Sequence, residues 1–417
     1  MDAASLTKLL SPEGWALLNA LPPYDEGQAM VLATRLRAEG VDPDLAAAVL
    51  TQSRLRAKAR TKLGSFADGM LFTPDGVEQA TRLVVAGLHA RRYLAAGVTK
   101  VADLTSGVGA DALAFAGVGL DVLATDVDEM TAAMATVNLR AFPEAEVRHA
   151  DGLTLDLAAE GVDGVYADPA RRTRGGRRIF DPSAYAPPLD AVWALRDQVP
   201  ALGIKVGPGI PHHGLPADAE TQWVSVDGDV VEAGLWFGPL APDGPGRSAH
   251  VLRTTAEGTA SRTLRTGRTD GTGEEADGEL VPEVGPVGAY LYEPDGAVVR
   301  AGLVAHAAAE LGGRLVDRTI AYVTADAPAP APPSGTAPLA TGYRVLDVMP
   351  FNLKKLKAYL RERGVGRLTV KKRGTAVTPE QLRAQLSLKG DASATLVLTR
   401  VAGRQHVLVV EPHAGRA

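Results

Sequence analysis

Short apolar segments alternate with helical stretches between residues 98 and 207. The segments read VTKVADL (98–104), DVLATD (121–126), AEVRHAD (145–151), GVDGVYADP (161–169) and ALGIKVG (201–207), and each ends in a turn or an acidic residue. Such alternation is typical of βαβ units. QWVSVDGDVVEAGLWFG (222–238) then places two apolar runs around Asp227-Gly228, a strong hairpin signal. The pattern predicts an α/β fold whose parallel sheet ends in an antiparallel hairpin.

The flanking sequence predicts further segments. Residues 1–95 carry apolar residues at helical spacing, which predicts an N-terminal helical region before a sheet domain over 96–240. Residues 241–327 form an expected insertion or extension, and its first part (240–285) is so rich in Gly, Thr and charge that we expect mostly loop. Prolines over 328–339 predict a semi-rigid linker. Residues 340–411 then predict a small α/β domain that includes a Thr378–Gln381 capping box.

The segment DLTSGVGAD (103–111) follows the first expected strand and opens a helix. Gly107 and Gly109 would let the backbone pass close to a ligand where a Cβ would collide. The spacing Gly107-x-Gly109-x-x-Ala112 also satisfies the dinucleotide fingerprint, and Asp126 lies where that fingerprint places a ribose-binding acid. The glycines alone therefore leave an NAD-dependent oxidoreductase open.

Four acids at successive strand ends favour a different ligand. Asp103 would repel a pyrophosphate but suits an ammonium group, Asp126 suits a ribose diol, and Asp151 can accept a hydrogen bond from an adenine amine. Asp168 ends the fourth strand, and the carboxyl ends of parallel strands share one crevice. Each acid taken singly could be a helix cap or a turn residue. Together they predict a cationic ligand without phosphate, namely S-adenosylmethionine.

These stretches resemble class I methyltransferases. The residues that carry the resemblance are DLTSGVGAD, VLATDVD (122–128), the Asp151-Gly152 turn and DPAR (168–171). The resemblance implies a Rossmann-like sheet and S-adenosylmethionine-dependent methyl transfer. It places the cofactor at Asp103, Thr105, Ser106, Gly107, Gly109, Asp126, Val127, Asp151, Gly152 and Asp168.

More closely, the whole chain resembles a bacterial group in which such a methyltransferase carries a C-terminal THUMP-like domain. The matching stretches are TPDGVEQAT (73–81), YADPARR (166–172), YLYEPDGAVVRAGL (290–303), VMPFNLKKLK (348–357) and LTVKKRG (368–374). Domains of the THUMP type bind RNA in RNA-modifying enzymes. The resemblance therefore implies RNA binding by residues 340–411.

The segment DPAR resembles the Asp/Asn-Pro-Pro-aromatic sequence of methyltransferases that act on base amines. Asp168 and Pro169 match it, whereas Ala170 and Arg171 depart from it. We expect Asp168, Pro169 and Arg171 to form the catalytic set, with Asp168 orienting an amine and the Arg171 guanidinium stacking on a base. The chain has no cysteine, which excludes a thiolate adduct and an iron–sulfur cluster. A nitrogen or a 2′-oxygen is then the favoured acceptor.

The charge is unevenly distributed. The chain carries a net charge of −5, yet from Val348 onward it holds 14 Lys/Arg against 4 Asp/Glu. A basic tail of this kind suggests a nucleic-acid partner; the alternative is that these lysines only solvate a surface. The expected RNA contacts are Arg171, Arg172, Arg174, Lys205, Lys354, Lys355, Lys371, Lys372 and Arg373. A small-molecule or protein methyltransferase and a non-catalytic cofactor-binding RNA-binding protein stay open as alternatives.

Two further expectations concern metals and location. Without cysteine and with scattered histidines, no metal site is expected. No apolar stretch approaches the ~18 residues of a membrane span, and the first residues lack the pattern of a signal peptide. We therefore expect a cytoplasmic protein.

Overall fold

The computed structural model describes residues 3–170, 185–266 and 280–413. Its contacts divide the chain into two compact units. The first comprises Met1–Val206 and Leu235–Pro242, and the second comprises Gly207–Gly234 and Asp243–Ala417. This division differs from the five segments expected from the sequence, because residues 243–327 group with the C-terminal region.

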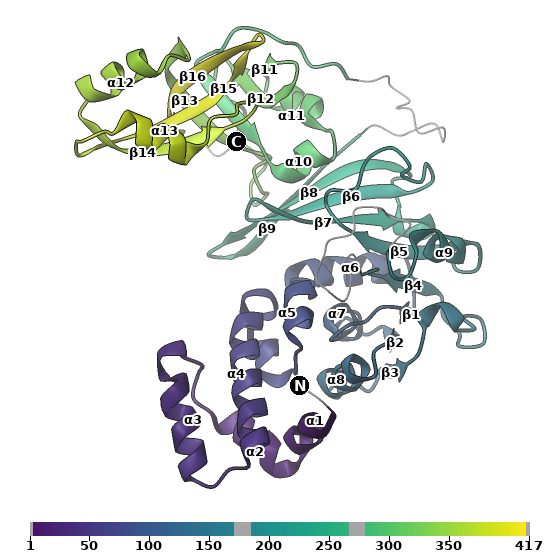
Figure 1. The fold of residues 1–417 in the computed structure, drawn as a ribbon. Coiled ribbons are helices and arrows are strands. Elements are labelled where there is room, and N and C mark those ends of the chain that lie inside the picture. The colour runs from purple at the N-terminus through teal and green to yellow at the C-terminus, as the bar shows by residue number, and fades with distance from the viewer. Residues whose placement is uncertain (1–2, 171–184, 267–279, 414–417) are drawn as a thin grey trace. The chain divides into compact units, whose positions relative to one another are not determined.

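The first unit begins with helices, as the apolar spacing predicts (Figure 1). They are α1 (Ala3–Leu10), α2 (Pro12–Ala20), α3 (Ala29–Ala38), α4 (Pro43–Leu63), α5 (Pro74–Gln79) and α6 (Leu83–Ala95). Three of them start with the same local chemistry. Ser11, Asp42 and Thr73 accept a hydrogen bond from a backbone N–H of the first turn, and a proline occupies the next position. That position has no helical partner for an N–H, so proline is tolerated there.

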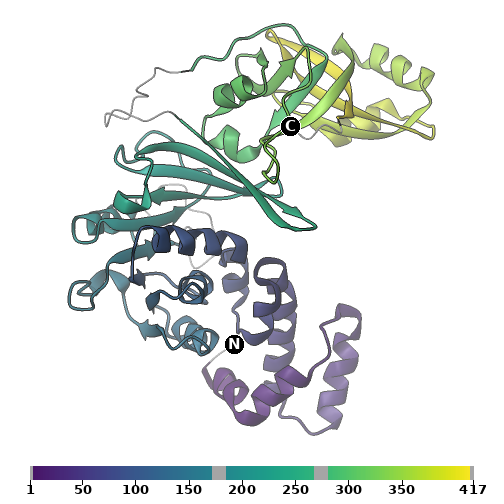
Figure 2. The ribbon, with the colours of Figure 1, turned by 180° about the vertical axis from the view of Figure 1, so that it is seen from behind.

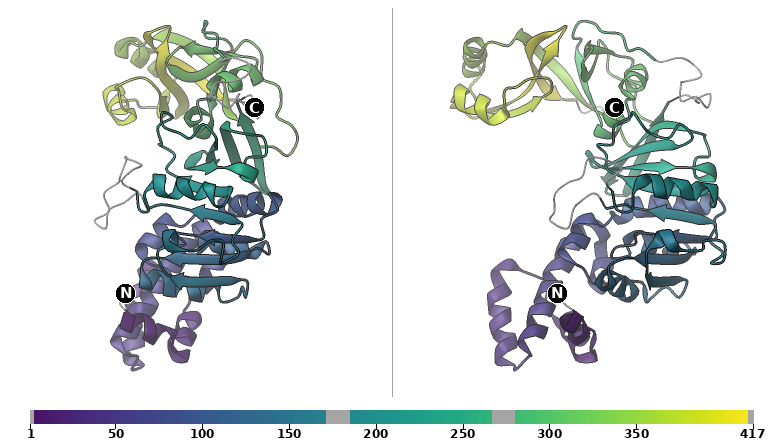
Figure 3. Two further views of the ribbon diagram at one scale, coloured as in Figure 1. Left: turned by 90° about the vertical axis from the view of Figure 1, so that its right-hand side faces the viewer. Right: turned by 45° about the vertical axis from the view of Figure 1, so that its right-hand side comes forward.

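The main sheet of the first unit contains β1 (Lys100–Asp103), β2 (Asp121–Asp126), β3 (Ala145–His149), β4 (Gly164–Ala167) and β5 (Ala201–Val206), all parallel. Helices α7 (Ala110–Gly117) and α8 (Glu129–Leu139) cover one face, and α9 (Leu189–Ala194) lies on the other (Figure 3). Right-handed β–α–β crossovers place these helices on opposite faces of the sheet, because the strand order runs outward from β1 in both directions.

The parallel strands are followed by the expected hairpin. Strands β6 (Glu220–Val226) and β7 (Asp229–Trp236) are joined at Asp227-Gly228, where both residues have positive φ. The complete strand order is β3-β2-β1-β4-β5-β7-β6-β8-β9. The predicted α/β fold, with a parallel sheet that finishes in a reversed strand, is confirmed.

Aromatic side chains attach α6 to this sheet. Tyr93 is fully buried and its ring meets the rings of Phe115 and Trp236 edge-on. Its hydroxyl donates a 2.5 Å hydrogen bond to the Val165 carbonyl. Trp15 packs separately under the guanidinium groups of Arg56 and Arg140. The N-terminal helices are thus part of the first unit's folded body.

Residues 246–265 correct an expectation from the sequence. Strands β8 (Gly246–Thr255) and β9 (Gly258–Arg265) form an antiparallel hairpin where mostly loop is expected. The sequence favours a loop because β9 contains exposed Thr and Ser, half-buried Arg and few apolar residues. Such a polar sequence is compatible with an edge strand, which has one side free of ladder partners.

The second unit also holds a sheet in the order β11-β12-β10-β13-β16-β15-β14 (Figure 2). Its strands are β10 (Tyr290–Pro294), β11 (Arg314–Asp317), β12 (Ile320–Ala325), β13 (Ala340–Pro350), β14 (Val365–Lys372), β15 (Ala392–Val401) and β16 (Arg404–Pro412). Residues 290–325 and 340–412 therefore share one sheet. The expected linker over 328–339 is not a free tether, because Ala337 and Leu339 are buried.

Two apolar layers enclose the C-terminal strands. On β15 and β16, Leu396, Leu398, Val407 and Val409 pack against α12 (Leu353–Glu362) and α13 (Pro379–Leu386), while Val397, Leu408 and Val410 join the opposite core. Short helices α10 (Gly296–Arg300) and α11 (Val304–Glu310) complete the unit. The Thr378–Gln381 capping box forms as expected. Within the described ranges, no helix has the length and apolar character to span a membrane.

Candidate active site

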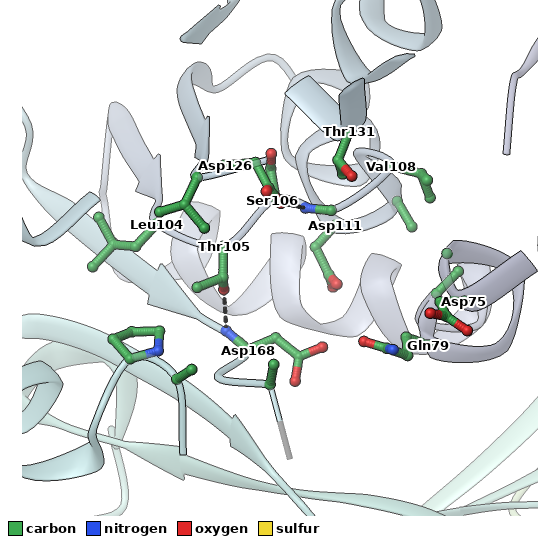
Figure 4. Close-up of a pocket in the computed structure, with 18 of the residues that line it drawn as sticks. Asp75, Gln79, Leu104, Thr105, Ser106, Val108, Asp111, Asp126, Thr131 and Asp168 are labelled. Carbon is green, nitrogen blue, oxygen red and sulfur yellow. Dashed lines mark hydrogen bonds between the residues drawn. The ribbon is translucent and has the colours of Figure 1, made fainter. Parts of the chain in front are cut away.

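A cavity of about 530 Å³ opens at the carboxyl ends of β1, β2 and β4 in the first unit (Figure 4). Its walls come from the glycine loop after β1, from the turns after β2, β3 and β4, and from the segment that includes α5. The lining residues include Thr105, Ser106, Gly107, Asp126, Val127, Asp151, Asp168, Asp75, Gln79, Thr81 and Asp111. The structure thus brings most of the expected cofactor residues to one cavity, as the strand-end argument requires.

The glycine loop is shaped by left-handed backbone conformations. Gly107 has φ +55° and Gly109 has φ +85°, values that side-chain-bearing residues rarely adopt. The Ser106 N–H donates to the Thr125 carbonyl (2.9 Å), and the Gly107 N–H donates to Asp126 Oδ2 (3.1 Å). A Cβ on Gly107 would meet no atom within 4 Å. The loop therefore leaves open space at the point where a ligand would pass.

Asp103 lies beneath this loop and is only 1% exposed. One of its oxygens accepts a hydrogen bond from the Thr105 N–H (3.2 Å). The other, Oδ2, is buried without a hydrogen-bond partner among the described residues, and so is Ser106 Oγ. Burial raises the pKa of Asp103 well above its ordinary value, and the charge of Asp111 adds to the effect. A nearby cation would favour the ionised form of this buried carboxyl group, so the position is suited to a cationic partner.

Asp126 and Asp151 combine local bonds with exposure to the cavity. Asp126 accepts backbone hydrogen bonds from Gly107 and Asp128, and burial raises its pKa. Asp151 caps a short turn by accepting from the Leu153 N–H (3.0 Å). A Cβ on Gly152 would come within 2.8 Å of Leu104 and Thr125, so only glycine allows this turn to approach the loop. Both acids hold the walls in place as well as lining them.

Asp168 stands at the end of β4, held from two sides. Its backbone N–H donates to Thr105 Oγ1 (2.6 Å), and its Oδ2 lies 2.5 Å from Lys205 Nζ on β5 (Figure 4 shows the first contact). Pro169 is buried behind it. Ala170 and Ala186 exchange two backbone hydrogen bonds beside the cavity. The geometry fixes a carboxylate on the cavity wall next to Asp103 and the glycine loop.

Comparison with known proteins gives the family. Two curated relatives, from Mycobacterium tuberculosis strains CDC 1551 and H37Rv, are each 33% identical to this chain over 361 residues, covering 83% of the chain and 90% of the relative. Both are described as uncharacterized S-adenosylmethionine-dependent methyltransferases. The chain belongs to this family.

Further similarities concern the fold and two segments of the chain. A crystal structure from Porphyromonas gingivalis W83, described as a "putative methyltransferase", is similar in fold over 94% of this chain and 100% of that chain, with a TM-score of 0.70 at 21% identity. Residues 340–412 match a family described as THUMP domain-like. Residues 2–59 match a domain of unknown function (DUF8688). The resemblance inferred from the sequence is confirmed.

The cavity suits the cofactor of this methyltransferase family. Asp103 lies beneath the glycine loop and is not one of the lining residues, but its unpartnered oxygen offers a hydrogen-bond acceptor to an ammonium group. The open space over Gly107 admits a chain close to the backbone. Asp126 and Asp151 supply carboxylates along the cavity wall. Because cavity and family agree, S-adenosylmethionine is the cofactor of this chain. In the described ranges no group of three acidic or histidine side chains is arranged to hold a metal ion.

Several lining residues were not expected from the sequence. Asp75, Gln79 and Thr81 come from TPDGVEQAT, one of the stretches that carry the family resemblance, and Asp111 follows the glycine loop. Gly76 explains how this stretch reaches the site. A Cβ there would lie 2.6 Å from Val108, so glycine lets α5 pack directly on the loop.

Three of the expected RNA contacts already have an anionic partner in the structure. Lys205 is 7% exposed and bound to Asp168, so little of its side chain is accessible to RNA. Lys371 Nζ lies 2.6 Å from Glu293 Oε2, and Arg373 lies 3.7 Å from the same carboxylate. Both therefore have a structural partner within the methyltransferase. Lys354, Lys355 and Lys372 are exposed, whereas Arg171, Arg172 and Arg174 lie outside the described residues.

Proposed function

We propose that this methyltransferase modifies RNA and that the acceptor atom is a base nitrogen. The observation that carries the proposal is Asp168, a carboxylate fixed at the end of β4 on the wall of the cofactor cavity. A carboxylate in this place can accept a hydrogen bond from an amine and aim its lone pair. The match of residues 340–412 to THUMP-like domains supports RNA as the substrate.

In this mechanism the protein acts mainly by positioning. When bound, S-adenosylmethionine supplies the electrophilic methyl group. Asp103, Ser106, Gly107, Asp126 and Asp151 would hold it, with Asp103 on the ammonium group. Asp168 orients the acceptor amine, and Thr105 holds the backbone of Asp168 by their 2.6 Å hydrogen bond. Alignment of two reactants in this way supplies much of the rate enhancement in a displacement.

Pro169 and Arg171 complete the expected catalytic set. Pro169 is buried next to Asp168 and stiffens the backbone on which the carboxylate stands. Arg171 would stack its guanidinium plane on the flipped base in place of an aromatic ring. Arg172 and Arg174 would bind neighbouring phosphates.

The test is methylation of bulk RNA with methyl-labelled S-adenosylmethionine, followed by mass spectrometry of the nucleosides. We expect label on a base nitrogen, and for Asp168→Ala a fall of more than 100-fold in the methylation rate that exceeds any loss of cofactor affinity. Label in protein or small molecules would contradict the RNA assignment. Binding of cofactor and RNA without turnover would instead establish a non-catalytic binding protein.

The exposed lysines of α12 give a separate prediction. Lys354 and Lys355 are exposed on the helix, while Leu356 and Leu360 are fully buried beneath it. If each lysine neutralises one phosphate of single-stranded RNA, Lys354→Ala with Lys355→Ala should flatten the log–log salt dependence of binding by about 1.4, or ~0.7 for each contact. Filter binding across a salt series measures this. Arg37→Ala, exposed on α3, is the control and should leave the slope unchanged.

A further inference from the structure

Buried polar groups form a continuous chain that leads away from Asp168. Lys205 Nζ, 2.5 Å from Asp168 Oδ2, also donates a 2.8 Å hydrogen bond to Thr81 Oγ1. Thr81 donates to Asp111 Oδ2 (2.6 Å), and Asp111 Oδ1 lies 2.9 Å from His89 Nδ1. Lys205, Thr81, Asp111 and His89 are each at most 7% exposed. They come from β5, the α5–α6 connection, α7 and α6.

The hydrogen-bond direction in this chain is determined by chemistry. A lysine ammonium can only donate, so the Thr81 hydroxyl must accept from Lys205. The single hydroxyl hydrogen of Thr81 is then available for Asp111. Thr81 consequently links the positive charge of Lys205 to a second carboxylate, in addition to Asp168.

The pKa of Asp111, the carboxyl group in this chain, favours its ionised form. Burial would raise the pKa of Asp111, but the hydrogen bond and charge of His89, followed by the charge of Lys205 and the Thr81 hydroxyl, bring it below its ordinary value. Lys205 therefore lies between two carboxylates, one direct and one through Thr81. A buried lysine without such partners would tend to lose its proton.

We propose that Lys205 is a positioning residue for methyl transfer, which fixes the orientation of the Asp168 side chain and keeps its carboxylate ionised. The inference rests on the proposed role of Asp168 as the acceptor of an amine hydrogen bond. Lys205 engages Oδ2, and Figure 4 shows the Asp168 carboxylate directed to the part of the cavity that Gln79 and Asp111 also face. Thr81 and Asp111 keep Lys205 in place.

Several charged groups around Asp168 bear on its ionisation. Asp103 at the end of β1 and Asp111 on α7 are like charges, and each disfavours a further carboxylate nearby. Asp126 on β2 lies on the same cavity wall, as does Asp75 of α5. Lys62 on α4 interacts with Lys205 as a second positive charge. Without Lys205, Asp168 would therefore protonate at higher pH.

The experiment compares Lys205→Met with Lys205→Arg in the full chain. We measure the pH dependence of kcat/KM for RNA methylation, the dissociation constant for S-adenosylmethionine, and the ¹³C carboxyl titration of Asp168, assigned by its absence in Asp168→Asn. For Lys205→Met we expect kcat/KM near pH 6.5 to fall at least 30-fold, and both the acidic limb and the Asp168 titration to move up by at least one pH unit. In Lys205→Arg the Asp168 titration and the acidic limb should lie close to those of wild type. In both variants the affinity for S-adenosylmethionine should change less than threefold.

A second pair keeps the inference testable should Lys205→Met not fold. Thr81→Val removes the hydroxyl at nearly constant volume, and Thr81→Ser keeps it. We expect the valine variant alone to shift the Asp168 titration upward. An unshifted titration in Lys205→Met, or in Thr81→Val where the first does not fold, overturns the inference. If the titration shifts but wild-type protein methylates no RNA, only the proposed function fails.

Discussion

Replacing Asp103 with asparagine is expected to weaken S-adenosylmethionine binding by about 2–5 kcal/mol, the cost of truncating a buried charge pair. The side chain is 1% exposed and its Oδ2 is unpartnered among the described residues, so an ammonium group would find its main anionic partner there. Calorimetric titration of both proteins measures the loss. An affinity within threefold of wild type would contradict the assignment of Asp103 to the ammonium.

The same substitution should stabilise the protein without cofactor. Because burial raises the pKa of Asp103 in the folded state, ionisation of this group opposes folding. The penalty is absent below the ordinary value of 3.8, grows as pH rises toward the folded-state value, and is constant above it. The melting temperature of Asp103→Asn should therefore exceed that of wild type by a margin that widens with pH. Excess S-adenosylmethionine should reverse the order, since ligand stabilises only the protein that binds it.

The strand-end acids show what a sequence can provide about such a site. Parallel strands bring their carboxyl ends to one edge, so Asp103, Asp126, Asp151 and Asp168 could be placed together from topology alone. The glycine loop is equally local, because Gly107 and Gly109 need left-handed backbone. Both features depend on short stretches of chain and follow from the alternation of strands and helices.

The residues that sequence reasoning missed depend on contacts between distant elements. Thr81 and Gln79 reach the cavity because α5 packs on the glycine loop through Gly76, which no spacing rule reveals. The sequence predicts Lys205 as an RNA contact, although all of β5 is buried. A lysine between Ile204 and Val206 on a central strand needs an anionic partner, and Asp168 provides it. The polar strand β9 was missed because an edge strand needs few apolar residues.

The basic residues of β14 and the turn after it also have a partner that the sequence does not reveal. Glu293 lies 78 residues before Lys371 in the chain, yet their side chains are 2.6 Å apart. Arg373 reaches the same carboxylate and also packs over the Tyr322 ring. Although burial lowers the pKa of Lys371, hydrogen bonds to Glu293 and Tyr343 raise it above its ordinary value. The segments YEPD and LTVKKRG therefore hold β10 and β14 together within the second unit.

Lys371→Met should accordingly destabilise the second unit by about 1–3 kcal/mol, the range for a charge-assisted hydrogen bond, with the lower end favoured by the partial exposure of both side chains. Lys372→Met is the matched control on the next residue. Its side chain is exposed, so its stability should stay within about 0.5 kcal/mol of wild type. Urea unfolding of the two variants measures the difference.

RNA binding by the same two variants should show the opposite order. Lys372→Met should flatten the salt slope by about 0.7, since this lysine can reach a phosphate. Lys371→Met should leave the slope unchanged wherever the protein stays folded, because its ammonium is already bound to Glu293. Glu293→Gln combined with Lys371→Met should recover part of the lost stability, as removal of both charges leaves no unpaired carboxylate. Equal slopes and equal stabilities for the two lysine variants would mean that the contact with Glu293 has no energetic role.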